Sequence, residues 1–76
     1  MKTDLKHVIA VLVAIDKGED PVQCVPFRLG EGREGRWYRL EVFHHLIHRR
    51  KLITQNLELT ERGKAALRRY KREGSA

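Results

Sequence analysis

The stretch LITQNLELTERGKAAL, residues 52–67, contains the strongest structural signals of this chain. Two apolar residues open it, a polar turn follows at residues 54–56, and an alternating apolar and polar segment comes next. Thr60 then stands where a side-chain cap would begin a helix, because a threonine oxygen accepts hydrogen bonds from the first free N–H groups of a helix. We therefore expect a short antiparallel β-hairpin, with Asn56 in a left-handed conformation, followed by a C-terminal helix.

The segment before this stretch has the period of an amphipathic helix from residue 36 to about Arg50. Its largest apolar side chains fall on one face, which we predict to enter the core: Trp37, Leu40, Phe43 and Ile47. The opposite face has Tyr38, Val42, His45 and Arg49, flanked by Arg39. The basic run at residues 49–51 suits the C-terminal end of this helix, where the helix dipole favours positive charge.

The N-terminal segment predicts a helix over residues 5–16, capped by Thr3 or Asp4 and ended at Gly18. A buried strand is the competing interpretation, because many of its apolar residues are β-branched. The cap, the stop and the length favour the helix.

Together these elements predict a single α+β domain over residues 1–76, with three helices and a short antiparallel β-hairpin. Residues 25–29 are predicted as an edge strand that adds to the hairpin, and residues 30–36 as a flexible loop. Residues 1–3 and 73–76 are expected to be frayed. The predicted core consists of Leu5, Ile9, Leu12, Trp37, Leu40, Phe43, Ile47, Leu59, Leu67 and Tyr70.

Residues 36–67 resemble the recognition helix, wing and following helix of winged helix-turn-helix transcriptional regulators. Residues 49–53, RRKLI, stand where that family ends its recognition helix and enters the wing. Residues 59–67, LTERGKAAL, are similar to its frequent leucine-threonine, glycine, leucine opening of the final helix. The resemblance implies a small winged-helix-like domain that binds double-stranded DNA through the 36–51 helix and regulates transcription.

The excess of positive over negative charge is confined to the second half of the chain. Residues 1–38 have six Lys/Arg and six Asp/Glu, whereas residues 39–76 have ten and four, which supplies the whole net charge of +6. A one-sided field favours a polyanionic partner, although a basic tail can also serve solubility alone. We predict that the protein binds nucleic acid, with double-stranded DNA as the expected partner. The sequence alone does not distinguish DNA from RNA. The candidate contacts are Tyr38, Arg39, His45, Arg49, Arg50, Lys51, Gln55, Asn56, Lys64 and Arg68.

The sequence offers little for catalysis, so no enzyme is predicted. Ser75 is the only serine and stands near the C-terminus, while the lone Cys24 excludes an intramolecular disulfide. The glycines of residues 30–35 match a dinucleotide-binding pattern, but the rest of that site is missing, and no cofactor is expected. His44 and His48 lie one helical turn apart, yet no third ligand converges with them, and no metal is expected.

Helix 5–16 has more apolar surface than its main stripe, because Val11 and Val13 lie off that stripe. Packing against a second copy would bury them, which predicts a homodimer through helix 5–16. The alternative is that residues 25–29 or the C-terminal helix cover this face within one chain.

A second function class is a protein-interaction adaptor, in which the same scaffold binds an acidic protein partner without binding DNA. The longest apolar run, residues 8–15, is too short to cross a membrane, and no membrane association is predicted. A single cysteine and the absence of a secretion signature favour a cytoplasmic location.

Overall fold

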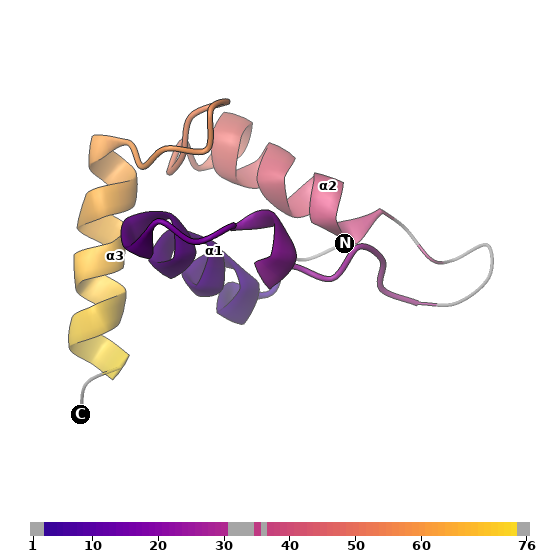
Figure 1. The fold of residues 1–76 in the computed structure, drawn as a ribbon, viewed down its shortest axis with the longest axis horizontal. Helices are drawn as coiled ribbons and strands as arrows, with labels where there is room; N and C mark the ends of the chain where they lie inside the picture. The colour runs from indigo at the N-terminus through magenta and orange to yellow at the C-terminus, as the bar shows by residue number, and fades with distance from the viewer. Residues whose placement is uncertain (1–2, 31–34, 36, 75–76) are drawn as a thin grey trace.

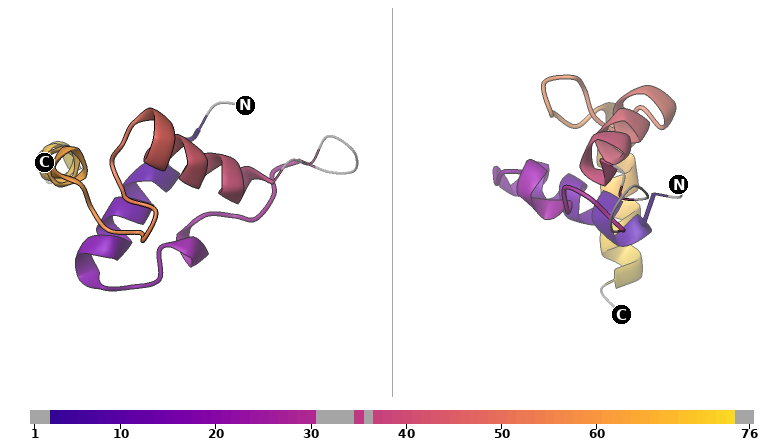
Figure 2. Two further views of the ribbon diagram at one scale, coloured as in Figure 1. Left: turned by 90° about the horizontal axis from the view of Figure 1, so that it is seen from above. Right: turned by 90° about the vertical axis from the view of Figure 1, so that its right-hand side faces the viewer.

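In the part of the chain that the structure describes, three α-helices form the fold together with one 3₁₀ and one π segment (Figure 1). The computed structural model describes residues 3–30, 35 and 37–74. The elements in chain order are α1 Leu5–Lys17, the 3₁₀ segment η1 Val22–Cys24, α2 Tyr38–His44, the π segment η3 His45–Arg49, and α3 Glu61–Gly74. Helices α1 and α2 cross one another, and α3 stands at one end of the pair, where Figure 2 shows it end-on.

The predicted capping and stop residues of α1 and α3 are confirmed. Asp4 caps α1, since its Oδ1 accepts a hydrogen bond from the Lys6 N–H at 3.1 Å. Gly18 ends α1 with φ at 79°, a conformation that glycine adopts without steric cost. Thr60 caps α3, because its Oγ1 accepts from the Gly63 N–H at 3.0 Å.

The predicted α+β class is wrong, because no strand and no β-hairpin occur among residues 3–30, 35 and 37–74. Between η3 and α3, only an isolated antiparallel bridge joins Ile53 to Leu59. The bridge consists of the bonds from the Thr60 N–H to the Leu52 carbonyl, at 3.1 Å, and from the Thr54 N–H to the Glu58 carbonyl, at 2.8 Å. It extends no further at Leu52, because the Leu52 N–H donates to the Leu46 carbonyl, at 2.8 Å, rather than to Thr60. The left-handed residue of the turn is Leu57, with φ at 61°, rather than Asn56.

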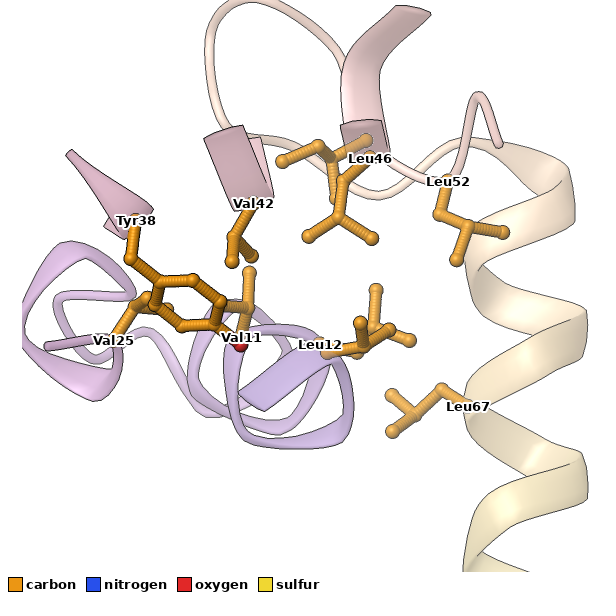
Figure 3. Packing of buried hydrophobic residues seen from close by; sticks show 10 residues of the cluster. Val11, Leu12, Val25, Tyr38, Val42, Leu46, Leu52 and Leu67 are labelled. Carbon is orange, nitrogen blue, oxygen red and sulfur yellow. The ribbon is translucent and has the colours of Figure 1, made fainter. Parts of the chain in front are cut away.

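The predicted buried face of the second helix is also wrong. Tyr38, Val42 and Leu46 are buried, whereas Trp37 and Leu40 are 57% and 64% exposed. The buried residues recur every fourth position along α2 and η3, which places them on one stripe that faces α1 (Figure 3). Burial of Tyr38 is possible because its hydroxyl has polar partners, accepting from the Asp4 N–H at 2.9 Å and lying 2.7 Å from His7 Nδ1.

The core joins all three α-helices and the segments between them. Figure 3 shows Tyr38, Val42 and Leu46 pointing toward Val11 and Leu12 of α1, with Leu52 and Leu67 closing the side next to α3. The cluster of buried residues is Val8, Val11, Leu12, Val25, Tyr38, Val42, Leu46, Leu52, Ile53 and Leu67. Of the predicted core, Leu12 and Leu67 are confirmed, and Leu5 is about half exposed. Phe43, Ile47, Leu59 and Tyr70 are partly buried against the cluster.

The reason given for a homodimer does not hold in this fold. Val11 is fully buried within one chain, and Val13 packs against the same core. The second apolar face of α1 is therefore covered internally, with Val25 among the residues that share its cluster. Val11 is therefore not accessible to a second copy of the chain.

Residues 25–29 form no strand, although Val25 is buried and the Phe27 carbonyl accepts from the Arg39 N–H at 3.3 Å. Of the predicted flexible loop 30–36, residues 31–34 and 36 lie outside the described residues, as do residues 1–2 and 75–76 of the predicted frayed ends. Residues 73–74 belong to α3, so the C-terminal helix extends further than the sequence predicted.

Candidate nucleic-acid interface

The basic run Arg49-Arg50-Lys51 lies at the C-terminal end of the π segment η3, where the helical turn is widened. The Arg50 N–H donates to the His45 carbonyl at 2.9 Å, an i to i+5 bond that defines the π segment η3. Lys51 follows with φ at 54°, which turns the chain so that Leu52 returns to the core. All three basic residues are exposed as a result.

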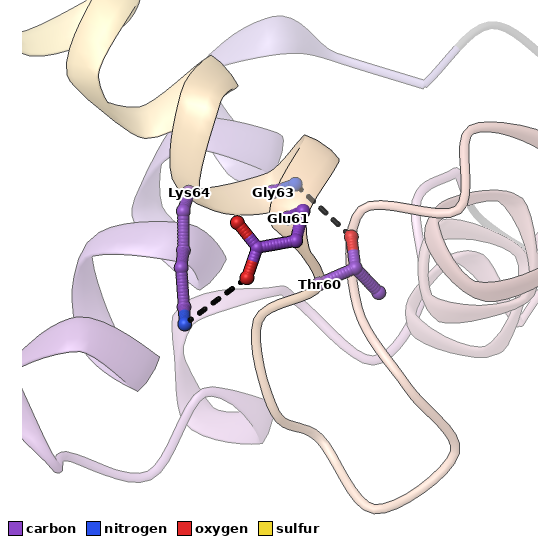
Figure 4. Close-up of polar contacts among 4 residues, drawn as sticks. All are labelled: Thr60, Glu61, Gly63 and Lys64. Carbon is purple, nitrogen blue, oxygen red and sulfur yellow. Dashed lines mark hydrogen bonds and ion pairs between the residues drawn. The ribbon is translucent and has the colours of Figure 1, made fainter.

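The first turn of α3 is fixed directly against this run. The Thr60 hydroxyl donates to the Lys51 carbonyl at 2.6 Å. The same oxygen caps the Gly63 N–H, as Figure 4 shows. Gly63 is buried, and a Cβ at this position would overlap the Leu52 carbonyl oxygen. The backbone of α3 at Gly63 therefore packs directly on the backbone of Leu52, which only glycine allows because it has no Cβ.

This close approach creates a basic groove between the two elements. One surface hollow, of about 340 Å³, is lined by Arg49, Arg50, Leu52, Arg62 and Ala65. A second, of about 420 Å³, is lined by Ala65, Arg68, Arg69 and Arg72. Ala65 borders both hollows, so the second, which lies along α3 alone, is the neighbour of the first; we call the two together the basic groove. Its lining contains six arginines and, among the residues whose side chains the structure describes, no acidic side chain.

Two predicted contact residues are used to hold the fold instead. Tyr38 is 1% exposed, so it cannot reach a nucleic acid, and its predicted role is wrong. Arg39 is partly buried and its Nε donates to the Val25 carbonyl at 2.7 Å. Its guanidinium carbon also lies 5.7 Å from the centre of the Phe27 ring. The start of α2 therefore lacks the exposed base-reading face that the sequence suggested.

The remaining predicted contacts divide into those near the groove and those away from it. Arg49, Arg50 and Arg68 line the basic groove. Lys51 and Lys64 are exposed on the two elements that form it, and Lys64 lies 3.7 Å from the exposed Glu61 carboxylate, a weak surface pair. The structure does not bring Gln55 and Asn56 into the groove, since they lie exposed in the turn between η3 and α3.

His45 lies beside the arginines of η3 and is partly buried. It borders a further hollow of about 330 Å³, lined by Thr3, Leu40, Glu41, His44, His45 and Arg49. Burial of the imidazole lowers the pKa of His45 below its ordinary value of 6.5, and the positive charges of Arg50 and Arg49 lower it further. Protonation of His45 is therefore less favourable in the folded chain than at an ordinary exposed histidine.

Sequence reasoning missed Arg62, Arg69 and Arg72 of the groove. The signal was present, because residues 62, 65, 69 and 72 recur at the three- and four-residue spacing that places side chains on one helix face. What the sequence did not contain was the position of that face opposite Arg49, which depends on the contact between Gly63 and Leu52.

Among the described residues, no group of three or more His, Cys, Asp or Glu is placed to hold a metal ion. The search of the same residues finds no helix that is both long and apolar enough to cross a membrane. Comparison of the chain with protein-family models, curated proteins and solved structures finds no match. The function is therefore argued from the chemistry of the groove itself.

Proposed function

We propose that this protein binds nucleic acid by holding its phosphate backbone in the basic groove. The observation that supports the proposal most strongly is that arginines at the end of η3 and along α3 line two neighbouring hollows, with no acidic side chain among the described residues of their lining. A guanidinium presents a planar fork of donors that matches two phosphate oxygens, and it stays charged at all physiological pH values. Phosphate contacts of this kind supply most of the affinity of sequence-independent binding.

The mechanism differs from that of a recognition helix inserted into the major groove. Tyr38 and Arg39, which would have read base edges, are engaged within the fold. The groove instead offers guanidinium groups along one side of α3 and at the end of η3. Such an arrangement suits positioning on a backbone rather than reading a sequence.

The test is the salt dependence of binding to a labelled 20-nucleotide oligonucleotide, followed by fluorescence anisotropy between 50 and 200 mM salt. Each phosphate contact adds about 0.7 to 0.9 to the slope of log affinity against log salt concentration. We expect Arg49→Ala combined with Arg62→Ala to reduce that slope by roughly 1.4 to 1.8.

The matched control is Lys6→Ala combined with Lys17→Ala, which removes the same charge from α1 and touches neither hollow of the groove. If both double variants weaken binding equally, net charge and not the groove governs the interaction. Competition by polyglutamate tests the adaptor alternative, since a groove built for an acidic protein would bind polyglutamate as tightly as the oligonucleotide. Either result would contradict the proposal.

A further inference from the structure

The other end of α2 carries an apolar hollow that the basic groove does not explain. This aromatic hollow, of about 350 Å³, is lined by Phe27, Trp37, Arg39, Leu40 and Phe43. Phe27, Trp37 and Leu40 are each about half exposed or more. Large apolar side chains grouped on the surface of a small protein mark a binding site more often than chance exposure does.

The walls of the aromatic hollow are held in place. The rings of Phe27 and Trp37 lie 5.2 Å apart between centres with their planes inclined at 44°. Arg39 also contacts Phe27: its guanidinium carbon lies 5.7 Å from the ring centre, and its backbone N–H donates to the Phe27 carbonyl at 3.3 Å. The result is a preformed surface of ring faces and a guanidinium plane.

A continuous surface connects this hollow to the basic groove. Leu40 lines both the aromatic hollow and the neighbouring hollow at His44 and His45. Arg49 in turn lines that neighbouring hollow and the basic groove. A ligand with one end on the aromatic rings and the other among the arginines would cross this middle hollow, whose lining contains Glu41 as well as Arg49.

We propose that the aromatic hollow stacks an unpaired base of a single-stranded nucleic acid whose phosphates lie in the basic groove. The inference rests on the proposed function and adds the class of substrate to it. Single-strand binding proteins combine a positively charged groove with exposed aromatic rings, because every base has a ring face that stacks irrespective of sequence. A duplex must first unstack a base, which costs free energy that a single strand does not expend.

An apolar peptide would also fill a hollow of this kind. The continuity with an arginine-lined groove favours a ligand that presents flat apolar groups and phosphates on one chain, which is the chemistry of a single-stranded nucleic acid. A second copy of this chain would instead place two surfaces of net positive charge close together.

Trp37 is the only tryptophan in the chain, so its fluorescence reports on the aromatic hollow directly. Titration with a single-stranded 12-mer should quench or shift this emission, whereas inorganic polyphosphate and an abasic 12-mer should bind without doing so. Trp37→Ala and Phe27→Ala should each weaken binding of the 12-mer by about 5- to 150-fold, the loss expected for one stacked base. The same variants should leave polyphosphate affinity unchanged.

The control is Leu5→Ala, which shortens an exposed apolar side chain that lines none of these hollows. It should bind the 12-mer as the wild type does. Equal affinity of wild type and Trp37→Ala for the 12-mer would overturn base stacking while leaving the basic groove intact. Failure of both the 12-mer and polyphosphate to bind would instead overturn the proposed function. Two results together would overturn base stacking in favour of a contact between two copies of the chain. The Trp37 emission would change with protein concentration alone, and Trp37→Ala would no longer self-associate.

Discussion

Lys51 holds a backbone conformation that residues with a side chain rarely adopt. Its φ is 54°, in the left-handed region where glycine is the usual residue at the end of a helix. For an L-residue this conformation costs about 1–2 kcal/mol. The conformation turns the chain at this corner, so that Leu52 reaches the core while Lys51 stays exposed.

Substitution of Lys51 separates backbone strain from charge. We expect Lys51→Gly to stabilise the fold by up to about 1 kcal/mol, because relief of the strain exceeds the entropy that glycine loses on folding. Lys51→Ala removes the charge and keeps the strain, so it should not stabilise. Both variants should weaken oligonucleotide binding equally. Urea unfolding gives the free energies, and a stabilisation by alanine as large as that by glycine would refute the strain argument.

His45 gives the fold a pH dependence of known sign. Because burial and the neighbouring Arg50 and Arg49 lower its pKa in the folded state, the unfolded chain binds this proton more readily than the folded chain does. Stability should therefore decrease as the pH falls through 6.5 toward the folded pKa. We expect His45→Gln to reduce the loss of Tm between pH 8 and pH 5, with His48→Gln as the matched control. An unchanged pH dependence in His45→Gln would contradict the assignment.

At the scale of elements, the contact between α3 and η3 decides whether the groove exists. Thr60 bonds to the carbonyl of Lys51 and to the N–H of Gly63, and Gly63 packs on the Leu52 carbonyl. These contacts set Arg62 opposite Arg49. A change that separates the two elements should widen the groove without removing any charge.

Gly63→Ala makes that change. At an open helical position alanine stabilises relative to glycine by about 0.5–1 kcal/mol, but here the added Cβ overlaps the Leu52 carbonyl oxygen. We expect a destabilisation of about 1–3 kcal/mol, as for other overpacked sites, and weaker oligonucleotide binding. Thermal unfolding measures the first effect. The control Ala65→Gly, at an exposed position of the same helix, should cost about 0.5–1 kcal/mol. A Tm of Gly63→Ala at or above that of the wild type would rule out the close contact.

At the scale of the whole molecule, one small core must hold α1, α2 and α3 together. Leu67 is the buried residue that α3 contributes to the cluster, and the ion pair of Lys71 with Asp16, at 3.0 Å, joins α3 to the end of α1. Both side chains of that pair are largely exposed, so it adds at most about 1 kcal/mol. Packing in the core therefore provides most of the attachment of α3.

Val11 tests whether one chain is sufficient for this core. A glutamate at this fully buried position would place a charge among apolar side chains, at a cost comparable to the whole stability of a small domain. We expect Val11→Glu to lose the helical dichroism signal, whereas Leu5→Glu, at an exposed position of the same helix, should keep it. Sedimentation equilibrium completes the experiment. A folded, monomeric Val11→Glu derived from a dimeric wild type would place Val11 at an interface after all.

The sequence by itself determined both ends of α1, the start of α3 and the location of the excess positive charge. Asp4, Gly18 and Thr60 act on groups within four residues of themselves, so their roles follow from local geometry alone. The excess of arginine and lysine in residues 39–76 is likewise a property of composition. The predicted β-hairpin also followed local pattern, and it is wrong, because a single bridge joins Ile53 to Leu59 and the Leu52 N–H bonds to the Leu46 carbonyl instead of to Thr60.

Only the tertiary structure decided which face of α2 is buried and which arginines meet. Tyr38 is buried because Asp4 and His7, more than thirty residues earlier in the chain, satisfy its hydroxyl. The more apolar side chains Trp37 and Leu40 remain on the surface as a consequence. Arg49 and Arg62 face one groove because Gly63 lets two backbones approach. Hydrophobic periodicity records how apolar each face of a helix is, but the partner that fills the space determines which face is buried.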